Sequence, residues 1–474
     1  MSRWPSIDEV VKEVKSGKVT AAQQVHKALE TIEAKSEFDA VIAATTERAK
    51  LRAQEIDDGV KDGRDMGRLA GVPFIAKDNI LAFGAETTAA SNILKGFDTP
   101  YQATVIKQLE AEGAICVAKA NLDAFAHGAS TENSDFMITK NPHDKTRVAG
   151  GSSGGPAAAV ILELAPFAIG TDTGGSIRQP ASFTGAVGYK PTYGLVSRNG
   201  VIAMASSTDV IGPLTKTVEE TALILDVISG RDQFDSTTIE RDPKSYITFE
   251  KPKKTVKIGL IKEYLEGGIA PDVKSKIEDA AKQLKADGYD VKEVSLPSLP
   301  LALACYYIIC PAEVSSNLSR YDGQRYGYSN RSANSLDDSY NWSRSEGFGK
   351  EAKRRIMIGT YVLSSGYYDA YYKQAMKLRT KLIKEFDKAF ESFDYLIGPT
   401  APSVAFKIGE KANDPLQMYL SDIMTVAANL VGVPSISIPV NSAGGLPIGL
   451  QIMSPQRSDR ELLGMAKAAE ELVG

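Results

Sequence analysis

The sequence is poor in the side chains on which disulfide frameworks and common metal sites depend. It has only three cysteines and three histidines among its 474 residues, namely Cys116, Cys305, Cys310, His26, His127 and His143. No two cysteines have the C-x-x-C spacing, and an odd number does not indicate a disulfide framework, so we expect a reducing, cytoplasmic compartment. The same scarcity argues against a zinc site of the common kind, and we expect no metal in this chain.

Long hydrophobic runs and a strong net charge are also lacking. No apolar run reaches the roughly 18 residues of a membrane helix, and the N-terminus lacks the hydrophobic region of a signal peptide, so we expect no membrane association. The formal net charge of −4 gives no electrostatic reason to bind nucleic acid over a wide face. The densest basic run, "KEAKRR" at 350–355, is typical of a solvated helix face.

What the sequence does have is a recurring alternation of strand and helix patterns. Strand patterns are expected at 71–80, 114–119, 167–170, 256–261, 289–296, 395–402, 435–440 and 447–453. Helices are expected at 103–112, 156–164, 217–228 and 272–286, with capping pairs at Ser6 and Glu9, Thr20 and Gln23, Thr217 and Glu220, and Ser458 and Glu461. Strand, helix and strand joined by short links indicate βαβ units.

We therefore predict a single large α/β domain over residues 1–474, with a central, mixed but mostly parallel sheet covered by helices. Strand patterns at both ends of the chain favour one sheet with a helical insertion over a string of domains. The expected parts are N-terminal helices at 1–65, a core at 66–230, a helical insertion at 300–390 and a return to the sheet at 391–474. Within the insertion, the polar stretch 328–347 is expected to be an exposed loop.

Glycine is concentrated in one region, since residues 150–200 hold eleven of the 40 glycines. Three kinds of segment would explain this, namely a phosphate cradle, a linker, or a loop that brings backbone N–H groups close to a substrate. Neither the P-loop pattern nor the G-x-G-x-x-G fingerprint is present. The glycines also flank an apolar helix and an apolar strand, which excludes a linker. The remaining interpretation is a loop that holds amides near chemistry.

Two serines in this loop, Ser152 and Ser176, could be nucleophiles if a base took their proton. Histidine is the usual base, and His127 and His143 lie nearby in sequence. Lys77 is a further candidate because it ends the apolar run "PFIAK". Its pKa would have to fall by roughly three units from 10.4, which is about 4 kcal/mol that burial can supply. A lone lysine in this position more often simply reaches solvent.

Three motifs together resemble the amidase signature family: "KDN" from Lys77, "AGGSSGG" at 149–155 and "GTDTGGSIRQPA" at 170–181. Their order and spacing, 75 residues from Lys77 to Ser152 and 24 from there to Ser176, also match that family. The resemblance implies that Ser176 is the acyl-forming nucleophile. It implies that Ser152, which follows a cis peptide bond at Gly151, links Ser176 to the base Lys77.

The resemblance also implies an oxyanion hole made by the N–H groups of Thr173, Gly174, Gly175 and Ser176. Glycines there would let the backbone approach the developing negative oxygen closely. Asp172 and Arg178 are expected to brace this loop.

Later segments, "YYIICPAEVSSNLSRYDGQRYG", "KRRIMIGTYVLSSGYYDAYYKQA" and "DYLIGPTAPSVAF", are similar to the A subunits of tRNA-dependent glutamyl/aspartyl amidotransferases. This implies a glutaminase that releases ammonia to a partner within a heterotrimer of A, B and C subunits. The partner would use ATP and Mg to amidate mischarged Glu-tRNA(Gln), and Asp-tRNA(Asn) is the other acceptor to consider. No cofactor is expected in this chain. The alternative is a stand-alone amidase acting on a small or peptide amide.

A glutamine pocket needs a cation for the α-carboxylate and an anion for the α-ammonium. The resemblance assigns these roles to Arg355 and Asp422, and it adds Gly128 and one of two tyrosines, of which we favour Tyr306 over Tyr307.

The sequence departs from the family near this pocket, where "DAFAHG" at 123–128 replaces "DEFAMG". His127 could titrate and modulate hydrolysis, or it could simply pack. A second departure, Pro156 in place of serine, suits the first turn of a helix.

Overall fold

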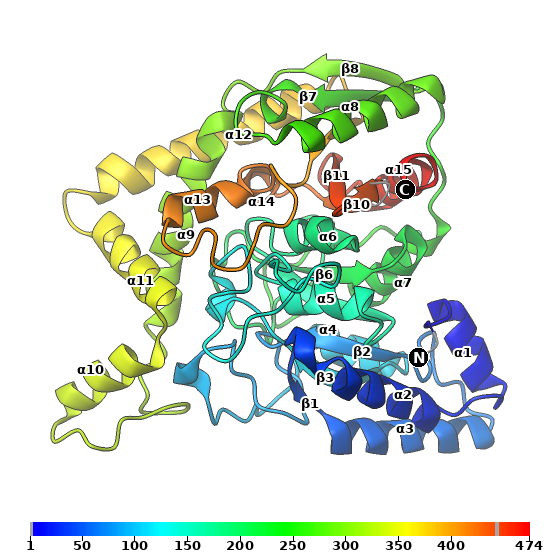
Figure 1. Ribbon diagram of the computed structural model, residues 1–474, viewed down its shortest axis with the longest axis vertical. Helices are drawn as coiled ribbons and strands as arrows, with labels where there is room; N and C mark the ends of the chain where they lie inside the picture. Colours follow the sequence, from blue (N-terminus) through cyan, green and yellow to red (C-terminus); the bar gives the residue numbers. More distant parts are fainter. Residues whose placement is uncertain (1–2, 441–444) are drawn as a thin grey trace.

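The computed structural model describes residues 3–440 and 445–474. Its strands form one mixed sheet in the order β1-β3-β2-β4-β6-β5-β10-β11-β9-β7-β8, which follows the long axis of the molecule in Figure 1. The strands are β1 Val41–Ala44, β2 Pro73–Lys77, β3 Ile115–Ala120, β4 Phe167–Asp172, β5 Val187–Lys190, β6 Val210–Thr215, β7 Lys257–Ile261, β8 Asp290–Val294, β9 Tyr395–Pro399, β10 Ser435–Val440 and β11 Ile448–Met453. A single large sheet covered by helices is the predicted fold class.

The α-helices are α1 Ile7–Lys15, α2 Ala21–Ala34, α3 Thr46–Lys61, α4 Thr104–Ala111, α5 Gly154–Ile161, α6 Arg178–Thr184, α7 Val218–Ile228, α8 Pro271–Ala286, α9 Ala302–Leu318, α10 Leu336–Gly347, α11 Lys350–Leu363, α12 Lys373–Phe390, α13 Pro415–Tyr419, α14 Val426–Val431 and α15 Asp459–Val473. The predicted caps at Ser6, Thr20 and Thr217 are confirmed, because each side chain accepts a hydrogen bond from the third residue of its helix. The cap predicted at Ser458 is wrong, since its side chain makes no such bond.

The expectation of a mostly parallel sheet is wrong. Strand β2 is parallel to β3 and β4, and β7 is parallel to β8 and β9. The other six neighbouring pairs among the described strands are antiparallel. The strand–helix–strand pattern identifies the two parallel parts correctly. Strands β10 and β11 follow one another without a crossover helix, and such strands pair antiparallel.

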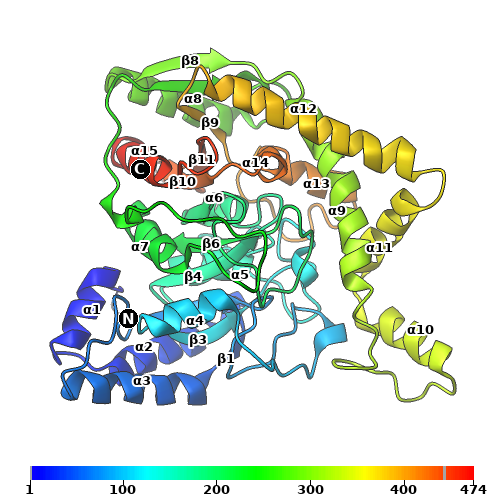
Figure 2. The ribbon, with the colours of Figure 1, turned by 180° about the vertical axis from the view of Figure 1, so that it is seen from behind.

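The helical insertion lies between β8 and β9, and its helices α9 to α12 stand together at one side of the sheet in both ribbon views (Figures 1 and 2). The stretch predicted to be a loop at 328–347 is partly wrong, because Leu336–Gly347 forms α10. Ser335 caps this helix by accepting from the Asp338 N–H, and two aspartates in the first turn complement the helix dipole. Here the capping signal outweighs the polar composition, which by itself favours a loop.

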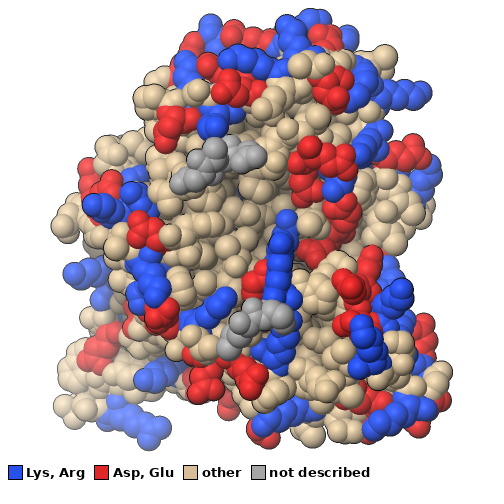
Figure 3. Space-filling view, turned by 45° about the vertical axis from the view of Figure 1, so that its right-hand side comes forward, with Lys and Arg blue, Asp and Glu red and all other residues tan. Residues whose placement is uncertain are grey.

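The helical segment Leu299–Leu318, which contains α9, has the length and hydropathy of a membrane span, although it holds no continuous apolar run of that length. Half of it is buried, and it packs against α11 and α12. Buried core helices of globular proteins have the same composition. On the face seen in Figure 3, acidic and basic side chains are interspersed, so this face carries no continuous basic field.

The fold brings the sequence motifs to one edge of the sheet. Lys77 ends β2, and Thr171 and Asp172 end the neighbouring parallel strand β4. Because parallel strands end at the same edge, these side chains are close together. Ser152 lies just before α5, and Ser176 lies just before α6. Both serines therefore lie near helix N-termini at this same edge of the sheet.

Candidate active site

The amine of Lys77 is fully buried and lies within hydrogen-bond distance of three hydroxyl oxygens. Lys77 Nζ is 2.7 Å from Ser152 Oγ, 2.9 Å from Ser153 Oγ and 2.9 Å from Thr171 Oγ1. Burial lowers the pKa of Lys77 to about 7, against the opposing fields of nearby carboxylates. The alternative that this lysine reaches solvent is therefore wrong.

The hydroxyls around Lys77 can accommodate a neutral amine. The Ser153 hydroxyl donates to the Thr171 carbonyl oxygen (3.0 Å), so its oxygen can only accept a bond from Lys77. A neutral amine has two N–H donors, which Ser153 and Thr171 Oγ1 can accept, and one lone pair, which would then be left for the Ser152 hydroxyl. Sequence reasoning missed Ser153 and Thr171, although the end of β4 beside β2 could have indicated the latter.

The second link of the predicted relay is not formed in this structure. The Gly151–Ser152 peptide bond is cis, as the resemblance implies. The Ser153 N–H donates to the Ser176 carbonyl oxygen (3.0 Å), which places the two serine segments side by side. Within the described residues, however, Ser176 Oγ makes no hydrogen bond to Ser152 Oγ. The backbone already holds Ser176 beside Ser152, and rotation of the Ser176 side chain is the movement that could join them.

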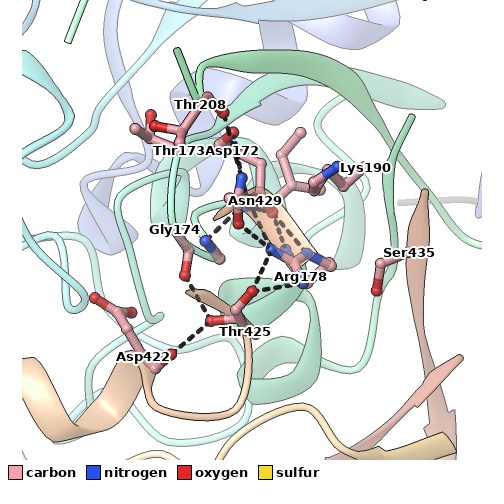
Figure 4. A network of polar contacts seen from close by, with 12 residues as sticks. Asp172, Thr173, Gly174, Arg178, Lys190, Thr208, Asp422, Thr425, Asn429 and Ser435 are labelled. Atoms are coloured by element: carbon pink, nitrogen blue, oxygen red, sulfur yellow. Dashed lines mark hydrogen bonds and ion pairs between the residues drawn. The ribbon is translucent and has the colours of Figure 1, made fainter. Parts of the chain in front are cut away.

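Asp172 and Arg178 brace the loop before Ser176, as predicted (Figure 4). Both side chains are fully buried, and they pair in two contacts, Nη2 to Oδ1 at 2.9 Å and Nε to Oδ2 at 3.0 Å. Burial alone would raise the pKa of Asp172, but the Arg178 guanidinium outweighs it and holds the value at about 2. Arg178 also donates to Gln451 and Asn429, at 2.6 Å each, which ties the loop to β11 and α14.

The loop amides are not all available to a substrate. The Gly175 N–H donates to Asp172 Oδ1 (2.8 Å). The N–H groups of Thr173, Gly174 and Ser176 have no acceptor in the described part of the chain. Gly175 itself has a φ of 135°, and a Cβ there would lie 2.1 Å from Thr425 Oγ1, so only glycine fits.

A pocket of about 120 Å³ is lined by two of the predicted binding residues, Gly128 and Arg355, together with Tyr307, while Lys77, Ser152 and the 173–176 loop do not line it. Arg355 is buried, and its Nε donates to Glu351 Oε1 (2.8 Å), while its guanidinium lies 5.3 Å from the centre of the Tyr307 ring. The Tyr307 hydroxyl donates to Asp422 Oδ2 (3.2 Å). Two of the predicted binding residues, Arg355 and Asp422, are thus joined through Tyr307.

The pocket is also tied to the loop before Ser176 (Figure 4). The Thr425 hydroxyl lies 2.6 Å from the Gly174 carbonyl oxygen and 3.1 Å from the Asp422 carbonyl oxygen. Burial raises the pKa of Asp422 to about 8, although Arg355 and Tyr307 oppose this. A cationic ligand beside this carboxyl would restore its charge.

Comparison with known proteins agrees with this geometry. The Amidase family profile matches residues 23–463. The chain belongs to the Amidase family. The A subunit of a glutamyl-tRNA(Gln) amidotransferase from Thermoanaerobacter pseudethanolicus is 51% identical over 98% of this chain and 96% of its own length. The crystal structure of the same-named protein from Thermotoga maritima matches with a TM-score of 0.82 and 40% identity, covering 98% of this chain and 94% of that one.

A peptide amidase from Stenotrophomonas maltophilia also matches, with a TM-score of 0.80, 30% identity and coverage of 98% of this chain and 96% of that one. The sequence therefore identified the correct family. In the described residues no cluster of His, Cys, Asp and Glu side chains could hold a metal ion.

Both tyrosines that the sequence offers for the pocket, Tyr306 and Tyr307, lie near the site. Tyr307 lines the pocket and contacts Asp422, as described above. Tyr306 instead lies against the loop, since a Cβ on Gly174 would be 2.7 Å from its ring. Adjacent residues of a helix point about 100° apart, so the rotation of α9 decides which tyrosine faces the pocket.

His127, which departs from the usual family residue, is fully buried, and neither ring nitrogen has a hydrogen-bond partner in the described part of the chain. Burial and the nearby Arg355 charge hold the pKa of His127 well below 6.5. The ring therefore stays neutral and packs, and it does not act as a titrating switch near pH 7.

Proposed function

We propose that this chain hydrolyses free glutamine to glutamate and ammonia as the A subunit of a tRNA-dependent amidotransferase. The 2.7 Å contact between the buried Lys77 amine and the Ser152 hydroxyl carries the proposal, because it supplies a base for acyl transfer without histidine. The full-length relatives at about half identity bear the name of that protein. We assign the roles of base, bridge and nucleophile to Lys77, Ser152 and Ser176.

In this mechanism Lys77 takes the Ser152 proton while Ser152 takes the Ser176 proton, and Ser176 Oγ attacks the γ-carboxamide carbon. The N–H groups of Thr173, Gly174 and Ser176 would stabilise the oxyanion. The proton then returns along the same path to the leaving nitrogen, which departs as ammonia. Water, activated by the same base, hydrolyses the γ-glutamyl ester and restores Ser176.

The charges in the pocket fit glutamine. Arg355 would bind the α-carboxylate, and Asp422 the α-ammonium, with Tyr307 between them and Gly128 in the wall. A bound ammonium would ionise Asp422, whose pKa of about 8 otherwise leaves it largely protonated at neutral pH.

The ammonia would pass to the B subunit of a cytoplasmic heterotrimer, in which the C subunit joins the other two. The B subunit would use ATP and Mg to convert Glu-tRNA(Gln) into Gln-tRNA(Gln), or Asp-tRNA(Asn) into Asn-tRNA(Asn). This chain itself would need no cofactor. The names of the relatives support a multi-subunit enzyme, and the chemistry assigned to the partners rests on that likeness.

The test is a glutaminase assay of the three-subunit complex with and without each mischarged tRNA. We expect ammonia release that rises when the acceptor tRNA and ATP are added, and that disappears in Ser176→Ala. Broad hydrolysis of simple or peptide amides by the isolated chain, with no complex formed, would instead identify a stand-alone amidase.

A further inference from the structure

We propose that Asp123 is a positioning residue for this hydrolysis, whose carboxylate holds the pocket wall at 125–133 against the Gly151–Ser152 segment. This inference rests on the proposed function. Asp123 follows β3, its side chain is fully buried, and it forms no ion pair in the described part of the chain.

Backbone amides of the pocket wall surround the carboxylate. The N–H groups of Thr131 and Ser130 donate to Asp123 Oδ2 at 2.9 and 3.3 Å, and the Asn133 N–H donates to Oδ1 at 3.1 Å. Charged acceptors make the stronger hydrogen bonds, so three such bonds fix this loop firmly.

The wall needs this restraint because its backbone is strained. Phe125, Ala126 and Thr131 have φ angles of 53°, 63° and 62°, in the left-handed region that residues with a Cβ rarely adopt. Conformations of this kind cost of order 1 kcal/mol or more each and persist only where surrounding contacts enforce them.

The Asp123 carboxylate also lies between Gly128, in the pocket wall, and Gly151, which precedes Ser152. A Cβ on Gly128, in the pocket wall, would lie 2.4 Å from Asp123 Oδ1. A Cβ on Gly151, just before Ser152, would lie 2.1 Å from Oδ2. The Asp123 N–H further donates to the Ser152 carbonyl oxygen (3.3 Å). One side chain therefore touches both the substrate wall and the bridging serine segment.

The charge of Asp123 acts on Lys77 as well. Among the carboxylates that raise the pKa of Lys77 against burial, Asp123 has the largest effect, followed by Asp172 and Asp209. Asp172 is paired with Arg178, and Asp209 accepts from the Thr173 hydroxyl at 2.7 Å.

Two further charged groups near Lys77 and Asp123 are Lys119 and Glu132. On the neighbouring strand, Lys119 is paired with Asp78 at 2.8 Å. Burial raises the pKa of Asp123 to about 6, and Glu132, in the pocket wall, also raises it to a smaller extent. Lys77 is the cation that lowers it.

Two variants test the charge and the length of this side chain. Asp123→Asn keeps the size but removes the charge and replaces one acceptor oxygen by an NH2 donor, so the acidic limb of kcat/KM for glutamine should move to lower pH by roughly one unit and KM should also rise. Asp123→Glu keeps the charge but is too long for the space between the glycines. It should leave that limb in place and raise KM about tenfold or more.

The controls make every outcome informative. Asn133→Ala removes a side chain from the same wall without changing charge, and it should leave the acidic limb where it is in the wild type. Rates are normalised to sites labelled by a fluorophosphonate, so misfolded protein is not counted, and if Asp123→Asn does not fold, Asp123→Glu carries the test. An unshifted limb in Asp123→Asn, or an unchanged KM in Asp123→Glu, overturns the inference. A wild type without glutaminase activity would instead overturn the proposed function.

Discussion

The pH dependence of glutamine hydrolysis should report the proton affinity of Lys77. An ordinary lysine with a pKa near 10.5 would be neutral in only about three molecules in ten thousand at pH 7. With the pKa lowered to about 7, about half of the molecules hold the neutral base. Burial among Ser152, Ser153 and Thr171 therefore raises the active fraction roughly a thousandfold, which corresponds to about 4 kcal/mol.

The predicted profile follows from this value. In the reconstituted enzyme, kcat/KM for glutamine should reach its plateau above pH 8, fall about fivefold from pH 7 to pH 6, and then fall about tenfold per unit. The assay is ammonia release over pH 5.5 to 9 in buffers of constant ionic strength. Lys77→Arg should lose nearly all activity at every pH, because a guanidinium does not deprotonate in this range.

Titration of Asp422 could produce a similar fall in kcat/KM at low pH, since the pKa of Asp422 is raised to about 8. The rate at which a neutral fluorophosphonate labels Ser176 separates the two, because that reagent needs the base but not the amino acid pocket. Labelling in Asp422→Asn should keep the same acidic limb. A labelling rate that does not change between pH 5.5 and 8 would refute a neutral lysine as the base.

Three further predictions concern single side chains. Lys77→Met should abolish activity and yet stabilise the fold by about 1 to 2 kcal/mol at pH 7 in urea unfolding, because the cost of deprotonating the buried amine exceeds the three hydrogen bonds lost. That gain should shrink as pH rises from 7 to 10.5, since the unfolded lysine then loses its own proton. Arg355→Lys should raise KM for glutamine about tenfold to a hundredfold and change kcat less, because a point charge replaces a planar fork held by Glu351. His127→Met should stabilise the fold by about 1 to 3 kcal/mol, because two unpartnered ring nitrogens are removed. It should also remove a loss of stability below pH 6.5, where the unfolded histidine binds a proton that the folded one does not. An unchanged thermal midpoint at pH 5.5 would contradict the account of His127.

The sequence alone predicted the parts of the site that depend on local patterning. Glycines around Ser152 and Ser176 mark loops where the backbone must approach other groups closely, and an apolar run before Lys77 marks a buried strand end. These signals lie within short segments, so they can be read without knowing how the segments pack. The resemblance then supplied the order and spacing that joined them.

Other parts depend on packing that no short segment encodes. Tyr306 and Tyr307 are adjacent on α9 and differ only in the direction in which the helix points their side chains. Arg355 reads as a surface residue within its basic run, and its burial follows from how α11 packs on α9, with Glu351 one turn earlier as its partner. The central antiparallel strands were missed for the same reason, because pairing between distant strands is set by the whole sheet.

The packing around Lys77 also explains why so many polar groups lie near the carboxyl ends of strands β2 and β4. A buried amine remains neutral near pH 7 only if desolvation exceeds the attraction of nearby carboxylates. Each of those carboxylates has its own partners: Asp172 has Arg178, Asp123 has three backbone amides, and Asp209 has the Thr173 hydroxyl and the N–H groups of Met204 and Ala205. Their charge is thus satisfied without a proton on Lys77. The loop before Ser176 supplies the Thr173 hydroxyl to Asp209 and the Gly175 N–H to Asp172, so the loop that carries the nucleophile also satisfies carboxylates near the base.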